Sequence, residues 1–281
     1  ENITDEFIPP ITISKNTHLK DGDGIIFFNI REDRARQLTQ SLIDKKFDKF
    51  QTKNINLSWI ITGISYDPNF KVNAVLCSKK KVKETFFDVL EKANMRLFSI
   101  AETEKYAHIT YFFNGGQEII RSNETRILIP SKSFKHTYAD IPEMSSPEIT
   151  QSLLSSLEND PQDFYLVNFA NADMVAHSGN LEATIKALKI LDECLTKIYN
   201  LVLNKLDGTI YITSDHGNAE YMYDINTKQF HTAHTCNKVP FIMLNNKNKV
   251  KQKLSLIGLS DIAPFILKNL NLPVPDIMKK S

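Results

Sequence analysis

The stretch GTIYITSDHGNAEYMYDINTKQFHTAHTCNKVP, residues 208–240, decides the fold prediction. Residues 209–213 form a short β-branched and aromatic run, which is typical of a buried strand. Asp215 and His216 follow directly at its end, and Gly217 allows the backbone to turn there. Because an adjacent carboxylate and imidazole contribute little to a hydrophobic core, this strand end predicts half of a metal site.

Two more histidines, His231 and His234, lie in the polar loop that closes the same stretch. Carboxylate and imidazole are ligands that suit Mn, Zn or Fe. An HTAH motif alone is a weak metal signal, and the spacing allows either histidine to be the ligand.

A second loop carries the same pair of residue types. Asp173 and His177 follow a predicted strand over residues 164–169, within a predicted loop over 170–179. If this segment makes a helical turn, residues four apart lie on one face. In open α/β sheets the carboxyl ends of strands are where ligands bind. The sequence therefore predicts one metal site built from separate loops at one edge of a sheet.

Alternating strands and helices predict an α/β fold with a mostly parallel sheet covered on both faces. The clearest helix begins near residue 181, with apolar residues at steps of three and four as far as residue 202. We expect the remaining strands at 25–30, 57–64, 72–77, 97–101, 127–130 and 239–244, and the remaining helices at 31–43, 84–93, from 145, and at 260–270. The composition changes at residues 78–82, which predicts a domain boundary there.

Composition excludes several function classes. The chain has 281 residues and a net charge of +1, which gives no electrostatic case for nucleic acid or a membrane surface. No apolar run approaches the roughly 20 residues that span a bilayer. Three widely spaced cysteines form neither a disulfide framework nor a CxxC knuckle, and Cys194 falls among apolar helix positions. We expect a reducing, cytoplasmic setting.

Five motifs resemble cofactor-independent phosphoglycerate mutases, a family of the alkaline phosphatase-like metalloenzyme superfamily. They read FFNIREDRARQL, IAETEKYAHITYFFNGGQE, NFANADMVAHSGNLEATIKALKILDECL, ITSDHGNAEYM and HTAHTCNKVPFI, in the order of the family. The resemblance implies a parallel sheet sandwiched by helices. It also implies that residues 1–80 are the C-terminal part of a smaller inserted α/β phosphotransferase domain that binds substrate. Residues 81–281 would be most of the phosphatase-like metal-binding domain.

The resemblance implies roles for the metal-site candidates. Asp173, His177 and His234 resemble the ligands of one divalent ion, and Asp215 and His216 resemble ligands of a second. Manganese is the usual metal of the family. The second histidine of HTAH is the family's ligand, which favours His234 at the position that spacing left open.

Three cationic residues match substrate-binding motifs of the family. Lys105 would place a positive charge beside the transferring phosphate, and Arg31 and Arg34 would hold the phosphoglycerate. The planar arginine fork suits this role because it can hold a carboxylate or phosphate with two bonds. His18, His108 and His136 have no partner spacing and are expected at the surface or on the substrate side at most.

The implied reaction interconverts 3-phosphoglycerate and 2-phosphoglycerate in glycolysis and gluconeogenesis. A serine takes the phosphoryl group and returns it to the neighbouring oxygen, while two metals neutralise charge. The covalent intermediate must avoid water, so closure of a second domain over the site is expected. No nucleic acid, membrane or protein partner is implied, and the full-length protein is expected to be a monomer.

The chain departs from the family in two respects. Ala176 stands where the family commonly has Gly. The nucleophilic serine and a further aspartate ligand match no residue here, and the motif gives that role to neither Ser178 nor Ser214. Because the sequence also begins with Glu1, we expect the C-terminal portion of a longer enzyme, inactive alone. We also expect it to fold poorly, because an incomplete parallel sheet leaves an edge unpaired.

Two other functions share these ligands. A related phosphohydrolase or phosphomutase with another substrate would have the same metal site, whereas the motifs of Arg31, Arg34 and Lys105 favour the mutase. A non-catalytic fragment that binds metal or a partner is the third possibility, which follows if these residues are the whole biological chain.

Overall fold

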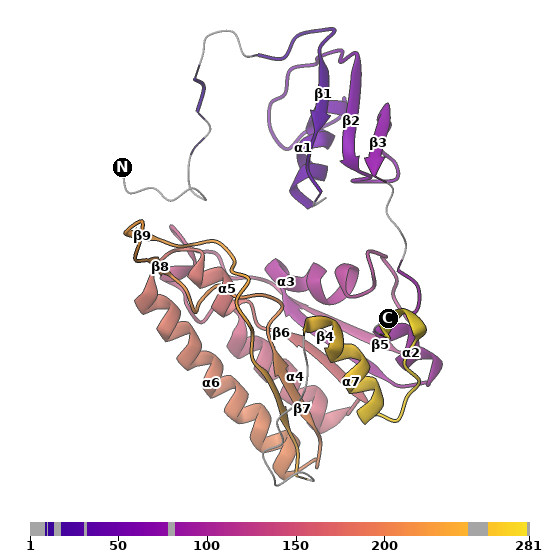
Figure 1. Ribbon diagram of the computed structural model, residues 1–281, viewed down its shortest axis with the longest axis vertical. Helices are drawn as coiled ribbons and strands as arrows, with labels where there is room; N and C mark the ends of the chain where they lie inside the picture. The colour runs from indigo at the N-terminus through magenta and orange to yellow at the C-terminus, as the bar shows by residue number, and fades with distance from the viewer. Residues whose placement is uncertain are drawn as a thin grey trace. The chain divides into compact units, whose positions relative to one another are not determined.

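The computed structural model describes residues 9, 11–13, 18–30, 33–77, 82–246 and 258–279 (Figure 1). The chain divides into two compact units, one spanning Pro9–Lys81 and the other containing Val82–Ser281. Each unit is described by itself.

The smaller unit is a parallel sheet with one helix. Its elements are β1 (Gly24–Phe27), α1 (Asp33–Ile43), β2 (Trp59–Ile64) and β3 (Ala74–Cys77). The strand order is β1-β2-β3, and both pairings are parallel. The strand β1 ends three residues before the predicted limit, and Phe28 and Ile30 beyond it are exposed. The Tyr66 hydroxyl donates to the carbonyl of Asn29 at 2.8 Å, which ties the end of β1 to the loop after β2.

The larger unit alternates strands and helices. In chain order its elements are α2 (Phe86–Lys92), β4 (Leu97–Glu102), α3 (Thr103–Ala107), the π-helical turn η2 (His108–Phe112), β5 (Glu124–Ile129), the 3-10 turn η3 (Tyr138–Asp140), α4 (Ser146–Asn159), β6 (Phe164–Asn168), α5 (Asn171–Ala176), α6 (Leu181–Asn204), β7 (Ile210–Thr213), β8 (Tyr223–Asp224), β9 (Gln229–Phe230), β10 (Phe241–Leu244), η4 (Leu259–Asp261), α7 (Ile262–Asn269) and η5 (Asp276–Met278).

The strands of this unit form two main sheets. The first has the order β5-β4-β6 with parallel pairing throughout, and every residue of its central strand β4 is buried. The second is the antiparallel pair β7 and β10, and β8 and β9 form a separate short hairpin. The predicted α/β class with mainly parallel strands is confirmed. The exception among the longer strands is β10, which pairs antiparallel to β7.

Both main sheets lie between the same two layers of helices. One hydrophobic cluster joins α2 and α7 to the sheets and includes Leu166 of β6 and Tyr211 of β7. The other joins α4 and α6 to the opposite face and includes Val167 of β6 and Ile210 of β7. The neighbouring side chains of each strand therefore point into opposite layers, as the alternation of a strand requires.

Two local predictions need correction. The segment predicted as a loop contains the helix α5, which the Asp-x-x-x-His spacing permitted but did not require. The helix α6 matches its prediction, yet Leu181, Ile185 and Leu188 of its apolar pattern are exposed. Its N-terminal half instead buries Ala183 and Ala187, because small residues allow the closest approach to α5 and η3. Cys194 is buried, as its apolar neighbours predict.

Candidate metal centre

The end of β6 and the helix α5 position the first pair of candidate ligands. Asn171 anchors the start of α5, because its buried amide nitrogen donates to the carbonyls of Pro142 and Glu143 at 2.7 Å each. Asp173 and His177 lie four residues apart, at one face of this helical turn. The Nε2 atom of His177 is 3.2 Å from Oδ1 of Asp173.

The end of β7 positions the second pair. Asp215 and His216 follow this strand, and Gly217 forms an isolated antiparallel bridge with Thr235. A Cβ atom at Gly217 would lie 2.2 Å from Oγ1 of Thr235, closer than any side chain tolerates. Glycine therefore allows the loop of His216 to approach the loop of His234.

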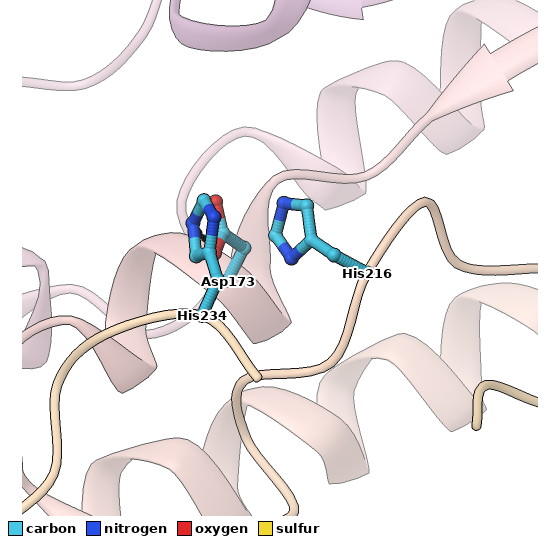
Figure 2. Close-up of side chains that lie close together, drawn as sticks. All are labelled: Asp173, His216 and His234. Carbon is cyan, nitrogen blue, oxygen red and sulfur yellow. Dashed lines mark ion pairs between the residues drawn. The ribbon is translucent and has the colours of Figure 1, made fainter. Parts of the chain in front are cut away.

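Imidazole and carboxylate groups from these three segments converge. Nε2 of His234 lies 3.2 Å from Oδ1 of Asp173 and 3.1 Å from Nε2 of His177. The rings of His216 and His234 stack with their centroids 3.7 Å apart. One ligand atom from each of Asp173, His216 and His234 lies within 4.8 Å of the others, and Figure 2 shows these side chains gathered from separate segments.

Asp215 lies at the outer side of this cluster. Its Oδ1 atom is 3.5 Å from Nε2 of His216, and its side chain is 60% exposed. The close group of ligand atoms contains His234, whereas His231 packs its ring edge-to-face against Tyr221. The division of the five residues between two ions stays a prediction, because ligand atoms of His216 and His234 both lie within 4.8 Å of one on Asp173.

Lys105 reaches the cluster from α3. Its Nζ atom donates to Oδ2 of Asp173 at 2.5 Å, and the two side chains are only 11% and 16% exposed. Burial acts to raise the pKa of Asp173, but the hydrogen bond with His177 and the charge and hydrogen bond of Lys105 outweigh it and hold that pKa far below its usual range. Asp173 is therefore an anion, with the Lys105 ammonium on Oδ2 and the two imidazoles near Oδ1.

The orientation of His177 indicates what the cluster binds. Nδ1 of His177 is 2.7 Å from the carbonyl oxygen of Thr232, so Nδ1 carries the proton and donates it. Nε2 faces Oδ1 of Asp173 at 3.2 Å, and it donates to that oxygen while it is protonated. Once this second proton is lost, Nε2 presents a lone pair beside the carboxylate oxygen. Burial foremost lowers the pKa of His234, which favours its neutral, ligating form as well. Electron pairs that face each other at this distance fit a divalent cation between them.

The other predicted residues are not part of this ligand cluster or fall outside the described residues. Arg31 and the side chain of Arg34 fall outside the described residues, in the smaller unit. The Ser178 hydroxyl donates to the carbonyl of Val175, and the Ser214 hydroxyl donates to that of His216 at 2.7 Å. Both serines thus stabilise local turns.

His18, His108 and His136 are not among the residues that form the described ligand group. Sequence reasoning missed Asn218, which is buried and whose Nδ2 donates to Oδ1 of Asp173 at 2.8 Å. Its position two residues after His216 was the only signal available in the sequence.

Comparisons with known proteins identify relatives of this chain. The sequence model of the metalloenzyme superfamily matches residues 18–274. The 2,3-bisphosphoglycerate-independent phosphoglycerate mutase of Clostridium acetobutylicum is 44% identical over 282 residues, which cover 99% of this chain and 54% of that protein. The protein of the same name from Legionella pneumophila is 41% identical over 98% of this chain and 53% of its own length.

A solved structure shows the same fold. The phosphoglycerate mutase of Leishmania mexicana, crystallised at low cobalt concentration, superimposes with a TM-score of 0.78 and 27% identity. The match covers 94% of this chain and 51% of that protein. The chain thus spans about half the length of the curated relatives it matches. No helix in the described part of the chain is long and apolar enough to cross a membrane.

Proposed function

The chain belongs to the metalloenzyme superfamily, and from this premise we propose that its protein interconverts 3-phosphoglycerate and 2-phosphoglycerate. The observation that carries the proposal is the position of Asp173. One of its oxygens meets the imidazoles of His177 and His234 at 3.2 Å, and the other meets the ammonium group of Lys105 at 2.5 Å. Such a centre combines cation ligands with a fixed positive charge, as the transfer of an anionic phosphoryl group requires.

Two divalent ions, manganese foremost, are proposed for Asp173, His177 and His234 and for Asp215 and His216. When bound, such ions neutralise charge on phosphoryl oxygens. The carboxylate and neutral imidazole donors described above support this assignment, and cobalt in the crystals of the Leishmania relative is in keeping with it.

The chain's own residues supply binding and orientation. Lys105 is held in place by Asp173, so its remaining ammonium protons can be offered to an anion beside the cluster. Its low exposure strengthens that attraction, because less water screens the charge. Arg31 and Arg34 are proposed to hold the carboxylate or phosphate of the substrate, on the motif that they share with the family.

The resemblance assigns the phosphoryl-accepting serine to a segment that matches no residue of this chain. We therefore expect no mutase turnover by the 281-residue chain alone, and turnover by the chain joined to the N-terminal half of the Clostridium relative. Residues 1–80 are proposed as part of the phosphotransferase domain and residues 81–281 as the metal-binding domain. A monomeric cytoplasmic enzyme remains the expectation for the full-length protein.

The test is ³¹P NMR of 3-phosphoglycerate incubated with this joined protein and Mn²⁺. We expect the 2-phosphoglycerate resonance to appear. Asp173→Asn should slow its appearance by at least about a hundredfold, because losing a metal ligand lowers activity more than losing the ligand's supporting partner does. Asp276→Asn is the matched control, since Asp276 is exposed and pairs only with Lys279 in the described chain.

Two outcomes would reject the mutase. Release of inorganic phosphate from several phosphate esters without isomerisation identifies a related phosphohydrolase. Binding of Mn²⁺ without any change in phosphate resonances identifies a metal-binding protein that has no phosphoryl-transfer activity.

A further inference from the structure

We infer that Asn218 is a positioning residue of the metal centre, which sets the orientation of the Asp173 carboxylate toward the bound cation. This inference rests on the metal binding proposed above. Asn218 is 4% exposed, and its Nδ2 donates to Oδ1 of Asp173 at 2.8 Å. This is the same oxygen that faces His177 and His234.

The two oxygens of Asp173 are held by different partners. Lys105 donates to Oδ2 alone. Without a directed donor at Oδ1, the carboxylate group could still rotate about its Cβ–Cγ bond. The Asn218 amide supplies that donor from the opposite segment of the chain. A carboxylate fixed at both oxygens presents a defined lone pair of Oδ1 to a cation that the imidazoles also bind. Outer partners raise the affinity of a metal site in this way.

Asn218 is itself fixed by the loop that carries His234. Its backbone N–H donates to Oε2 of Glu220 at 2.7 Å. The other oxygen of Glu220 accepts from the hydroxyl of Thr235 and from Nδ2 of Asn237, the latter at 3.0 Å. One asparagine therefore links the helix with Asp173, the loop with His216 and the loop with His234.

The remaining atom of the amide also points to a ligand. Oδ1 of Asn218 is buried and has no hydrogen-bond partner among the described residues. A buried amide oxygen without a donor is costly, whereas a metal-bound water in the site would satisfy it.

The test is isothermal titration with Mn²⁺ of the chain joined to the N-terminal half of the Clostridium relative, together with the visible absorption of bound Co²⁺. We expect Asn218→Ala to raise the Kd for Mn²⁺ by about tenfold or more and to change the Co²⁺ band positions. The control is Asn114→Ala, which removes another fully buried asparagine whose side chain bonds to Arg121 away from the cluster. We expect it to lower the melting temperature and to leave the Kd and the Co²⁺ spectrum unchanged.

The outcomes separate the two proposals. Absence of Mn²⁺ binding by the unsubstituted joined protein overturns the proposed metal centre itself. Binding by the unsubstituted joined protein with an equal Kd and spectrum for Asn218→Ala overturns only the positioning role. An equal rise of Kd in Asn218→Ala and Asn114→Ala also overturns it, because general destabilisation then explains the effect.

Discussion

The residue Gly217 shows how closely the ligand-bearing loops must approach. An added Cβ atom would lie 2.2 Å from Oγ1 of Thr235 and 2.4 Å from Oε1 of Glu220. Because Glu220 bonds to Thr235, neither group can move without breaking the contact between the loops of His216 and His234. Gly217→Ala is expected to destabilise the fold by about 1–3 kcal/mol, the usual cost of overpacking.

The same substitution should weaken Mn²⁺ binding about tenfold, as displacement of a supporting contact does. Urea unfolding measures the first effect and isothermal titration the second. Gly258→Ala is the matched control, because no described residue lies within 4 Å of an added Cβ there. A Gly217→Ala variant with the affinity of the unsubstituted chain would show that the loops tolerate separation.

Glu102 is a second residue with a measurable consequence. Its side chain is fully buried at the end of β4 and accepts from the Ser131 hydroxyl at 3.0 Å and from the backbone N–H of Ser145 at 3.4 Å. Burial raises the pKa of Glu102 above its usual value. The folded state therefore holds this proton more tightly than the unfolded state does, and ionisation at higher pH costs stability.

The pH dependence follows from that sign. The stabilising contribution of Glu102 is complete below its unfolded pKa of about 4.3 and is lost as the pH rises through the higher folded pKa. Glu102→Gln cannot ionise, so its melting temperature minus that of the unsubstituted chain should increase from pH 4 toward neutrality. Thermal unfolding at a series of pH values measures this difference. A difference that is constant with pH contradicts a raised pKa.

At this scale the sequence predicted the residues that converge but not those that hold them. Asp173, His177, Asp215 and His216 could be found because carboxylate and imidazole at strand ends have a chemical meaning of their own. Asn218 could not, because an asparagine after a glycine is equally typical of a turn. Only the fold shows that its amide points inward.

At the scale of elements, the helix α6 connects the two ligand-bearing regions and depends on a defined start. The side chain of Asn180 accepts from the backbone N–H of Ala183 at 3.0 Å and so caps the helix that the sequence predicted to begin near residue 181. Asn180→Ala should cost about 1 kcal/mol, because a first-turn donor loses its partner. Asn180→Asp keeps the acceptor and should be close to neutral. Urea unfolding of both variants tests this, and equal losses contradict the cap.

The helix α5 shows why an element was missed. Six residues are too few for hydrophobic periodicity to identify a helix, and the short polar segment looks like a loop. Its helical form depends on tertiary contacts, above all the bonds from Asn171 to the carbonyls of Pro142 and Glu143. The buried face of α6 was also misjudged, because periodicity shows that a stripe is apolar without showing what covers it.

At the scale of the whole molecule, the larger unit contains two sheets that share their helical layers without joining. Among residues 82–246 and 258–279, β6 pairs only with β4 and β7 pairs only with β10. Both strands nevertheless contribute to the same hydrophobic clusters on both faces. The sequence could predict each strand, but the pairing partners depend on contacts distant in sequence that no local pattern encodes.

The edge strands β6 and β7, each paired on one side in the described residues, predict a pattern of hydrogen exchange. In a parallel sheet successive N–H groups point to alternate sides, so about half of the β6 amides lack a strand partner within the described part of the chain, while those of β4 face strands on both sides. The residues of β6 are also only partly buried, whereas β4 is buried throughout. We expect alternate amides of β6 and β7 to exchange with D₂O much faster than any amide of β4, because their opening requires no cooperative unfolding.

Residue-resolved NMR of the folded 281-residue chain measures this, with β4 as the internal reference. Uniform protection across β6 and β4 would mean that another strand, from outside the described residues or from a second copy, occupies the edge.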